Sequence, residues 1–67
     1  MPKISLKAAR VNSGFTQRDV AEKLNVTKKT VSSWESGKTM PKLDKIEALC
    51  SLYNISFDSL FFVKKNA

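Results

Sequence analysis

Histidine is absent from this 67-residue sequence, and cysteine occurs once, at Cys50. The lack of histidine removes the most frequent general base and the most frequent nitrogen ligand for metals. A single cysteine excludes an internal disulfide and cannot provide the ligand spacing of a metal site. Only six carboxylate side chains are present, and no glycine-rich loop could hold a phosphate, so no catalytic set can be assembled. We therefore expect no enzymatic activity, no metal, no other cofactor and no small-molecule ligand.

Long apolar runs are also missing, and with them any sign of a signal peptide or a transmembrane helix. The expected location is the cytoplasm. The length predicts one domain, residues 1–67, with no room for a second core. Twelve Lys and Arg against six Asp and Glu give a net charge of +6. Such a charge suits a polyanionic partner, although charge alone does not distinguish a nucleic acid from an acidic membrane surface.

Local start and stop signals divide the chain into five predicted helices, which makes the expected fold all-α. Each start is a Ser or Thr, or follows a proline, and each stop is a Gly or Asn that can adopt positive φ. No strand-like alternation of useful length is present. The predicted helices run from a cap at Ser5 to about Ser13, from Thr16 to Asn25, from Thr27 to about Ser36, from about Leu43 to Tyr53, and from Ser56 through Leu60, Phe61 and Phe62. We expect a short tail at 63–67.

The third predicted helix has two contrasting faces. Val31, Trp34 and Glu35 share the inner face, where Trp34 is expected to be a core residue. The outer face carries only basic and hydroxyl side chains, which cannot form a core. In the fourth predicted helix, an apolar stripe is expected to be buried, with Leu52 pointing away from it; its members are Leu43, Ile46, Leu49, Cys50 and Tyr53.

Several short motifs between residues 14 and 41 occur at a characteristic spacing: Thr16-Gln17, Ala21, Asn25-Val26-Thr27, Trp34-Glu35 and Gly37-Lys38. Together they resemble the helix-turn-helix domains of lambdoid phage repressors and Cro proteins, the xenobiotic-response-element-like family. The resemblance covers about residues 5 to 62, with a helix-turn-helix unit at about 16–37. It implies a compact five-helix lambda-repressor-like domain. The family usually has glycine where this chain has Asn25 and Asn54, but asparagine also tolerates positive φ, so both turns are expected to form.

This resemblance implies a sequence-specific regulator of transcription that binds double-stranded DNA, most often as a repressor. In the family, the third helix docks in the major groove by its N-terminal part, which implies that bases are read by Lys28, Lys29, Ser32 and Ser33. Phosphate contacts are implied for Gln17 at the start of the second helix and for Lys38, Thr39 and Lys42 after the third. The family also pairs the positions of Arg10 and Glu35, which implies an ion pair between the first and third helices.

The C-terminal residues carry more apolar surface than a closing helix requires, which indicates self-association. We expect Leu52, Phe61 and Phe62 to form a dimer contact and Phe57 and Leu60 to cover the core. A homodimer would match a palindromic operator, since repressors of this kind bind as twofold dimers.

A second class of function uses the same fold: a protein-interaction module, such as an antitoxin or an adaptor. Antitoxins of this kind usually add a toxin-binding segment, whereas only about five residues follow the last predicted helix. That difference favours the regulator. A protein that co-purifies and is encoded nearby would favour the interaction module instead.

Overall fold

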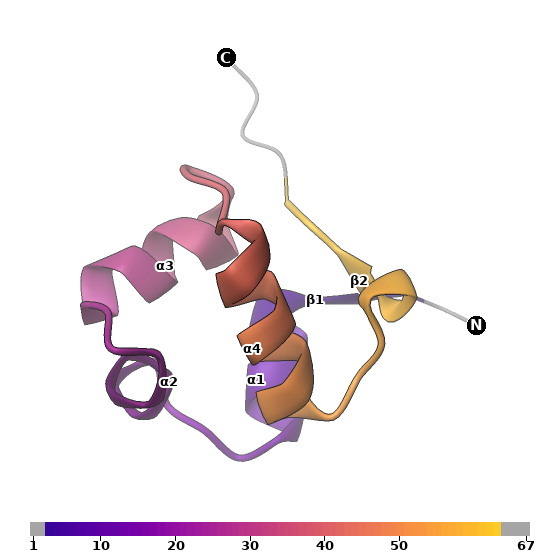
Figure 1. The fold of residues 1–67 in the computed structure, drawn as a ribbon, viewed down its shortest axis with the longest axis horizontal. Coiled ribbons are helices and arrows are strands. Elements are labelled where there is room, and N and C mark those ends of the chain that lie inside the picture. Colours follow the sequence, from indigo (N-terminus) through magenta and orange to yellow (C-terminus); the bar gives the residue numbers. More distant parts are fainter. Residues whose placement is uncertain (1–2, 64–67) are drawn as a thin grey trace.

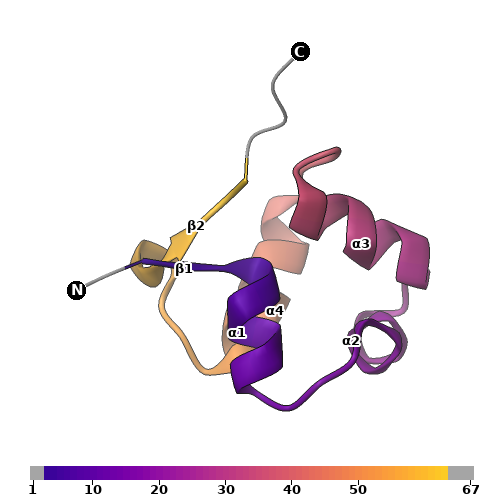
Figure 2. The same cartoon turned by 180° about the vertical axis from the view of Figure 1, so that it is seen from behind.

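Four α-helices form the body of the computed structural model, which describes residues 3–63 (Figure 1). Viewed from behind, α1 lies in front of α4, and α2 and α3 lie together on one side of this pair (Figure 2). A 3-10 turn and two very short strands complete the described part. The elements are β1 (Ile4–Ser5), α1 (Leu6–Asn12), α2 (Gln17–Leu24), α3 (Lys28–Ser36), α4 (Leu43–Tyr53), η1 (Phe57–Ser59) and β2 (Leu60–Phe61).

Side-chain caps fix the starts of the first three helices where the sequence predicts them. The hydroxyl of Ser5 accepts the amide of Ala8 at 3.1 Å, and the hydroxyl of Thr27 accepts the amide of Thr30 at 3.1 Å. At α2 the hydroxyl of Thr16 accepts the Asp19 amide, and the Asp19 carboxylate accepts the Thr16 amide in return. This capping box lowers the pKa of Asp19, chiefly through the hydrogen bond from the Thr16 backbone.

A left-handed residue follows each of the four helices. Gly14 after α1 has φ 81°, Asn25 has φ 57°, Gly37 has φ 83° and Asn54 has φ 55°. The two asparagines therefore take the conformation that glycine usually provides at a helix end, as predicted. Since Asn25 is the only left-handed residue between α2 and α3, it sets the direction in which α3 leaves the turn.

The core lies where the four helices meet. Val20 and Ala21 of α2 pack against Val31 and Trp34 of α3, and all four side chains are buried, which confirms Trp34 as a core residue. Burial raises the pKa of Tyr53 on α4 to about 12. The remaining buried members are Leu6, Ala9, Leu24, Ile46, Leu49 and Leu60.

The prediction of a fifth helix is wrong. Only the 3-10 turn of η1 forms after Ser56, and Leu60 is then extended, with φ −89° and ψ 143°. Leu60–Phe61 pairs in parallel with Ile4–Ser5, so that Ile4 lies opposite Leu60. Aromatic and branched side chains favour a pleated backbone, and the extended path places the Leu60 side chain in the core. The described residues therefore contain a minimal two-stranded sheet, which the sequence did not indicate.

Several expectations about single side chains also need correction. Leu43 was expected in the core but is 67% exposed, because the first turn of α4 extends beyond the edge of the core. Phe57 was expected to cover the core but is 56% exposed and faces Phe62 instead, with ring centroids 6.4 Å apart. Leu52 does not point away; it is half-buried and packs on the core, as Cys50 does. The predicted tail lies outside the described residues from 64 onwards.

Candidate nucleic-acid interface

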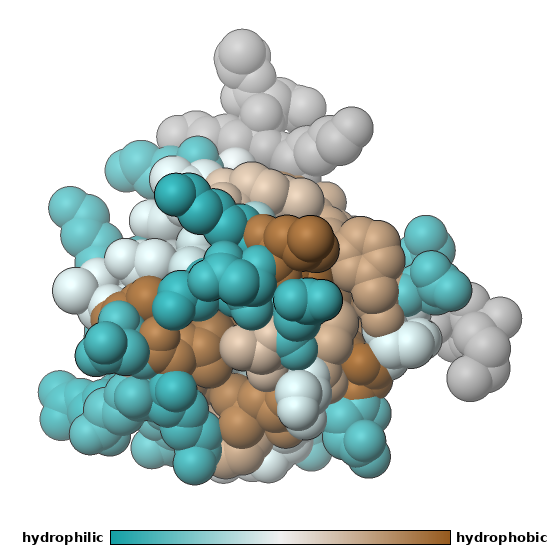
Figure 3. Space-filling model, in the orientation of Figure 1, coloured by the Kyte–Doolittle hydropathy of each residue, from teal (hydrophilic) through white to brown (hydrophobic). Residues whose placement is uncertain are grey.

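The outer face of α3 presents the residues that the sequence marks as base readers. Lys28, Lys29 and Ser32 are exposed, whereas Ser33 is half-buried. In Figure 3 the outer side of α3 is covered by weakly and strongly hydrophilic residues rather than apolar ones. Lys28 and Lys29 occupy the first turn, directly after the Thr27 cap. The N-terminal half of α3 is thus free, polar and basic.

The backbone carbonyl of Ser33 has a structural role that the sequence did not reveal. Its oxygen accepts the backbone amide of Lys38 at 2.9 Å, that of Thr39 at 3.3 Å and the hydroxyl of Ser36 at 3.2 Å. These bonds satisfy a carbonyl near the end of α3 and fold the following loop back onto the helix. The loop consequently holds Lys38 and Thr39 exposed next to the C-terminal end of α3. Lys42, just before α4, is exposed as well.

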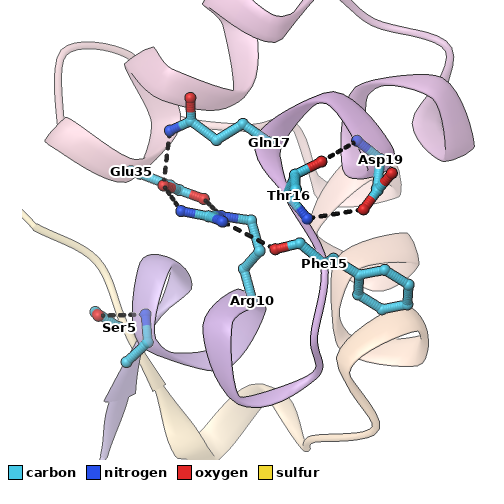
Figure 4. A network of polar contacts seen from close by, with 8 residues as sticks. Ser5, Arg10, Phe15, Thr16, Gln17, Asp19 and Glu35 are labelled. Atoms are coloured by element: carbon cyan, nitrogen blue, oxygen red, sulfur yellow. Dashed lines mark hydrogen bonds and ion pairs between the residues drawn. The ribbon is translucent and has the colours of Figure 1, made fainter.

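Arg10 of α1 and Glu35 of α3 form an ion pair that joins the two helices (Figure 4). The Nε atom of Arg10 donates to Oε2 of Glu35 at 2.7 Å, and its other nitrogens reach Oε1 of Glu35 at 3.3 Å and the carbonyl of Phe15 at 2.9 Å. The two side chains are 11% and 6% exposed. The hydrogen bond to Glu35 raises the pKa of Arg10, despite the opposing effect of burial. The pair is therefore nearly buried and is satisfied by hydrogen bonds.

Gln17 extends this network to the surface of α2. Its amide nitrogen donates to Oε1 of Glu35 at 3.0 Å (Figure 4). A carboxamide nitrogen carries two hydrogens, so one hydrogen remains for an external acceptor. The ion pair between α1 and α3 thus also fixes the orientation of a donor at the N-terminus of α2.

Two hollows open on either side of Gln17. One, of about 580 Å³, lies between the starts of α2 and α3 and includes Arg18 and Lys28. The other, of about 270 Å³, includes Lys7 of α1 and Ser32 of α3. Sequence reasoning missed Lys7 and Arg18 as parts of this surface. Lys7 precedes Arg10 by three residues, a spacing that places both on one helix face, and that signal could have identified it.

A larger hollow, of about 700 Å³, lies beyond the C-terminal end of α3 and is lined mostly by apolar side chains from the loop after α3 and from the C-terminal segment. Phe57 is 56%, Phe61 45%, Met40 60% and Val63 42% exposed. Phe62, by contrast, is half-buried against the core.

Residues 3–63 contain no group of three or more Asp, Glu or Cys side chains that could hold a metal ion. Among the same residues, none of the helices has the length and apolar character needed to cross a membrane.

Comparison with known proteins gives matches to a helix-turn-helix family and to regulators of transcription. Residues 6–60 match the helix-turn-helix family. The chain is 42% identical over 82% of its length to the transcriptional regulator ImmR of Bacillus subtilis, and 31% identical over 82% to the transcriptional activator BcrR of Enterococcus faecalis. It is also 44% identical over 54% of its length to the 26 kDa repressor protein of Escherichia phage HK022.

The aligned part spans 43% of ImmR, 27% of BcrR and 15% of the phage repressor, so these relatives are much longer than the matched domain. No solved structure matches the chain significantly.

Proposed function

This chain belongs to the Cro/C1-type helix-turn-helix family, and we propose that it regulates transcription by inserting α3 into the major groove of double-stranded DNA. One observation carries the proposal: the outer face of α3 is exposed, basic and free of carboxylates in its N-terminal half. A major groove about 12 Å wide admits such a helix, and base edges there present distinct hydrogen-bonding patterns.

Lys28, Lys29 and Ser32 are the proposed base readers, with Ser33 at the rim. A lysine ammonium pairs well with the O6 and N7 atoms of guanine, whereas a serine hydroxyl both donates and accepts and so discriminates less. Lys29 is therefore the residue on which sequence preference should depend most. The half-burial of Ser33 favours a smaller share for Ser33.

The proposed phosphate contacts lie around this face. Gln17 holds one free amide hydrogen at the N-terminus of α2, where the helix dipole also favours an anion. Lys38, Thr39 and Lys42 lie in the loop that the Ser33 carbonyl folds back onto α3. Contacts of this kind position a protein on DNA without reading its sequence.

A matched pair of variants tests the division between base and phosphate contacts. Lys29→Ala should weaken binding to the preferred operator by about 1–3 kcal/mol and alter which base is favoured at one position of each half-site. Lys42→Ala removes the same charge but should weaken binding to all sequences by a similar factor. Fluorescence anisotropy on a panel of single-base operator variants measures both effects. If the two variants reduced the binding of every sequence by one common factor, Lys29 would not be a base reader.

We propose repression as the direction of regulation. Occupying a promoter is enough to block transcription, whereas activation needs a further surface that contacts the transcription machinery. The relatives include one protein named an activator and another named a repressor, so similarity alone does not decide. Transcription in vitro from a promoter that overlaps the selected operator should fall as the protein is added; a rise would contradict repression.

We further propose a twofold dimer that uses the apolar surface around the C-terminal segment. The exposed Phe61 supports this surface, together with Phe57, Met40 and Val63. Leu52 and Phe62, the other expected dimer residues, are half-buried and therefore offer less contact area than Phe61. Phe61→Ser should shift sedimentation towards the monomer, while Val11→Ser, at a more exposed apolar residue on α1, should not. A wild-type protein that remains monomeric at high concentration and on operator DNA would refute the dimer.

A further inference from the structure

The smaller hollow beside Gln17 contains a cation that the DNA contacts described above do not use. Lys7 from α1 lines it together with Gln17 from α2 and three residues of α3: Ser32, Glu35 and Ser36. Three helices therefore contribute to one recess on the side of the molecule that carries the exposed Ser32. We call this recess the Lys7 hollow.

Several free hydrogen-bond donors line the Lys7 hollow. Gln17 donates one amide hydrogen to Glu35, and its second amide hydrogen is available to a ligand. The hydroxyl of Ser36 donates to the carbonyl of Ser33, whereas that of Ser32 makes no hydrogen bond within the described residues. The ammonium of Lys7 adds three donors. A hydrogen-bond acceptor in this recess would therefore meet donors from α1, α2 and α3.

The carboxylate in the hollow does not repel an anion strongly. Both oxygens of Glu35 accept hydrogen bonds from Arg10, and Oε1 also accepts one from Gln17. The Glu35 side chain is 6% exposed. The charge of Arg10 balances that of Glu35, so Lys7 gives the hollow a net positive charge.

We propose that the Lys7 hollow binds one phosphodiester group of the DNA backbone, with Lys7 as its cation and Gln17 as its oriented donor. This inference rests on the proposed function, because a base-reading α3 brings the backbone close to Ser32. It adds α1 to the DNA-contacting elements. It also gives the Arg10–Glu35 pair a direct role, since the pair neutralises the wall of an anion site and orients Gln17 within it.

A matched pair of charge-removing variants tests the role of Lys7. Lys7→Gln and Lys23→Gln both lower the net charge by one. Lys23 lies over the ring of Phe15, 5.5 Å from its centroid, and its hollow is lined by Asp19 and Glu22, so it is far less suited to meet DNA. Lys7→Gln should reduce affinity for all sequences roughly three- to tenfold at moderate salt and make the log–log salt slope shallower by about 0.9. Lys23→Gln should leave the slope unchanged, and Lys7→Arg should retain the wild-type slope.

Replacing single phosphates of the operator by uncharged methylphosphonates locates the contact. One substitution should weaken the wild-type protein but cause no further loss with Lys7→Gln. Equal salt slopes for Lys7→Gln and Lys23→Gln, or the absence of any such phosphate, would overturn the assignment of Lys7. If the wild-type protein bound no selected DNA, the proposed function would fail with it. If the wild-type protein bound DNA but Lys7→Gln left the affinity unchanged, only the assignment of Lys7 would fail. Because Lys7 is exposed, Lys7→Gln and Lys7→Arg should retain the wild-type circular dichroism spectrum and melting temperature.

Discussion

An apolar residue precedes a hydroxyl residue at Phe15-Thr16, where the helix-turn-helix unit at 16–37 starts, and at Ile55-Ser56 in the C-terminal segment at 54–63. The two regions are nevertheless held in different ways. In the first unit, the Thr16 and Thr27 hydroxyls accept backbone amides and the Arg10–Glu35 pair ties α3 to α1. In the second, the hydroxyl of Ser56 contacts that of Ser59 at 3.0 Å and makes no cap bond to the backbone.

This difference shows which kind of information determines each region. In the helix-turn-helix unit, each helix start is specified by residues three positions apart, and the outer face of α3 is polar. The C-terminal segment has no side-chain cap at the position where an α-helix could start. It ends in β2, whose partner strand β1 lies near the N-terminal end of the chain. Its apolar side chains are only partly covered. The face that we propose to read DNA and the apolar face that we propose for association thus occupy separate regions of one small domain.

Breaking the ion pair should give the largest effect on stability. Arg10→Ala leaves the nearly buried Glu35 carboxylate without its cation and also removes the bond to the Phe15 carbonyl. We expect a loss of about 3–5 kcal/mol in the free energy of unfolding, which is most of the stability of a domain of this size. Arg18→Ala, at an exposed position, should change stability by less than about 0.5 kcal/mol. Thermal and urea unfolding followed by circular dichroism measure both, and equal melting temperatures would refute the structural role of the pair.

Within the C-terminal segment, two neighbouring residues should respond very differently. Leu60 is 4% exposed and Phe61 is 45% exposed. Leu60→Ala should cost about 2–4 kcal/mol, because it leaves a cavity in the core. Phe61→Ala should cost clearly less in the monomer, and urea unfolding at low protein concentration compares the two. Similar losses would mean that Phe61 also contributes to the monomer core.

The caps provide the smallest and most specific comparison. Thr16→Ala should destabilise the protein by about 1 kcal/mol, because the Asp19 amide loses its acceptor at the start of α2. Ser56→Ala should change stability by less than about 0.5 kcal/mol, since its hydroxyl caps no backbone amide. The difference in melting temperature between these two variants is the readout. An equally large loss at Ser56 would show that the 3-10 turn depends on the Ser56–Ser59 contact.

The starts of α1, α2 and α3 and the ends of all four α-helices could be predicted because their signals are local: a hydroxyl accepts an amide three residues ahead, and Asn or Gly takes positive φ after the last turn. The start of α4 has no such cap and was predicted from Pro41 before it. The Arg10–Glu35 pair came from the family resemblance, and the structure contains it. The final strand could not be predicted. Leu60 pairs with Ile4 across almost the whole chain, and two residues are too few to show an alternating pattern.

Surface features that depend on several elements were also beyond the sequence. The position of Leu43 on the apolar stripe was consistent with burial, but the edge of the core falls one turn later, at Ile46. Lys7 looked like an ordinary exposed lysine on α1, and only the arrangement of α1, α2 and α3 places it beside Gln17 and Ser32.

Selection of bound sequences from a random pool of double-stranded DNA measures whether the outer face of α3 reads DNA. We expect enrichment of a motif with two inverted half-sites whose centres lie about one helical turn, roughly 10 base pairs, apart. The same selection with Lys29→Ala should return that motif with a changed preference at one position in each half-site. A pool that shows no enrichment with the wild-type protein, or an identical motif for both proteins, would contradict the account.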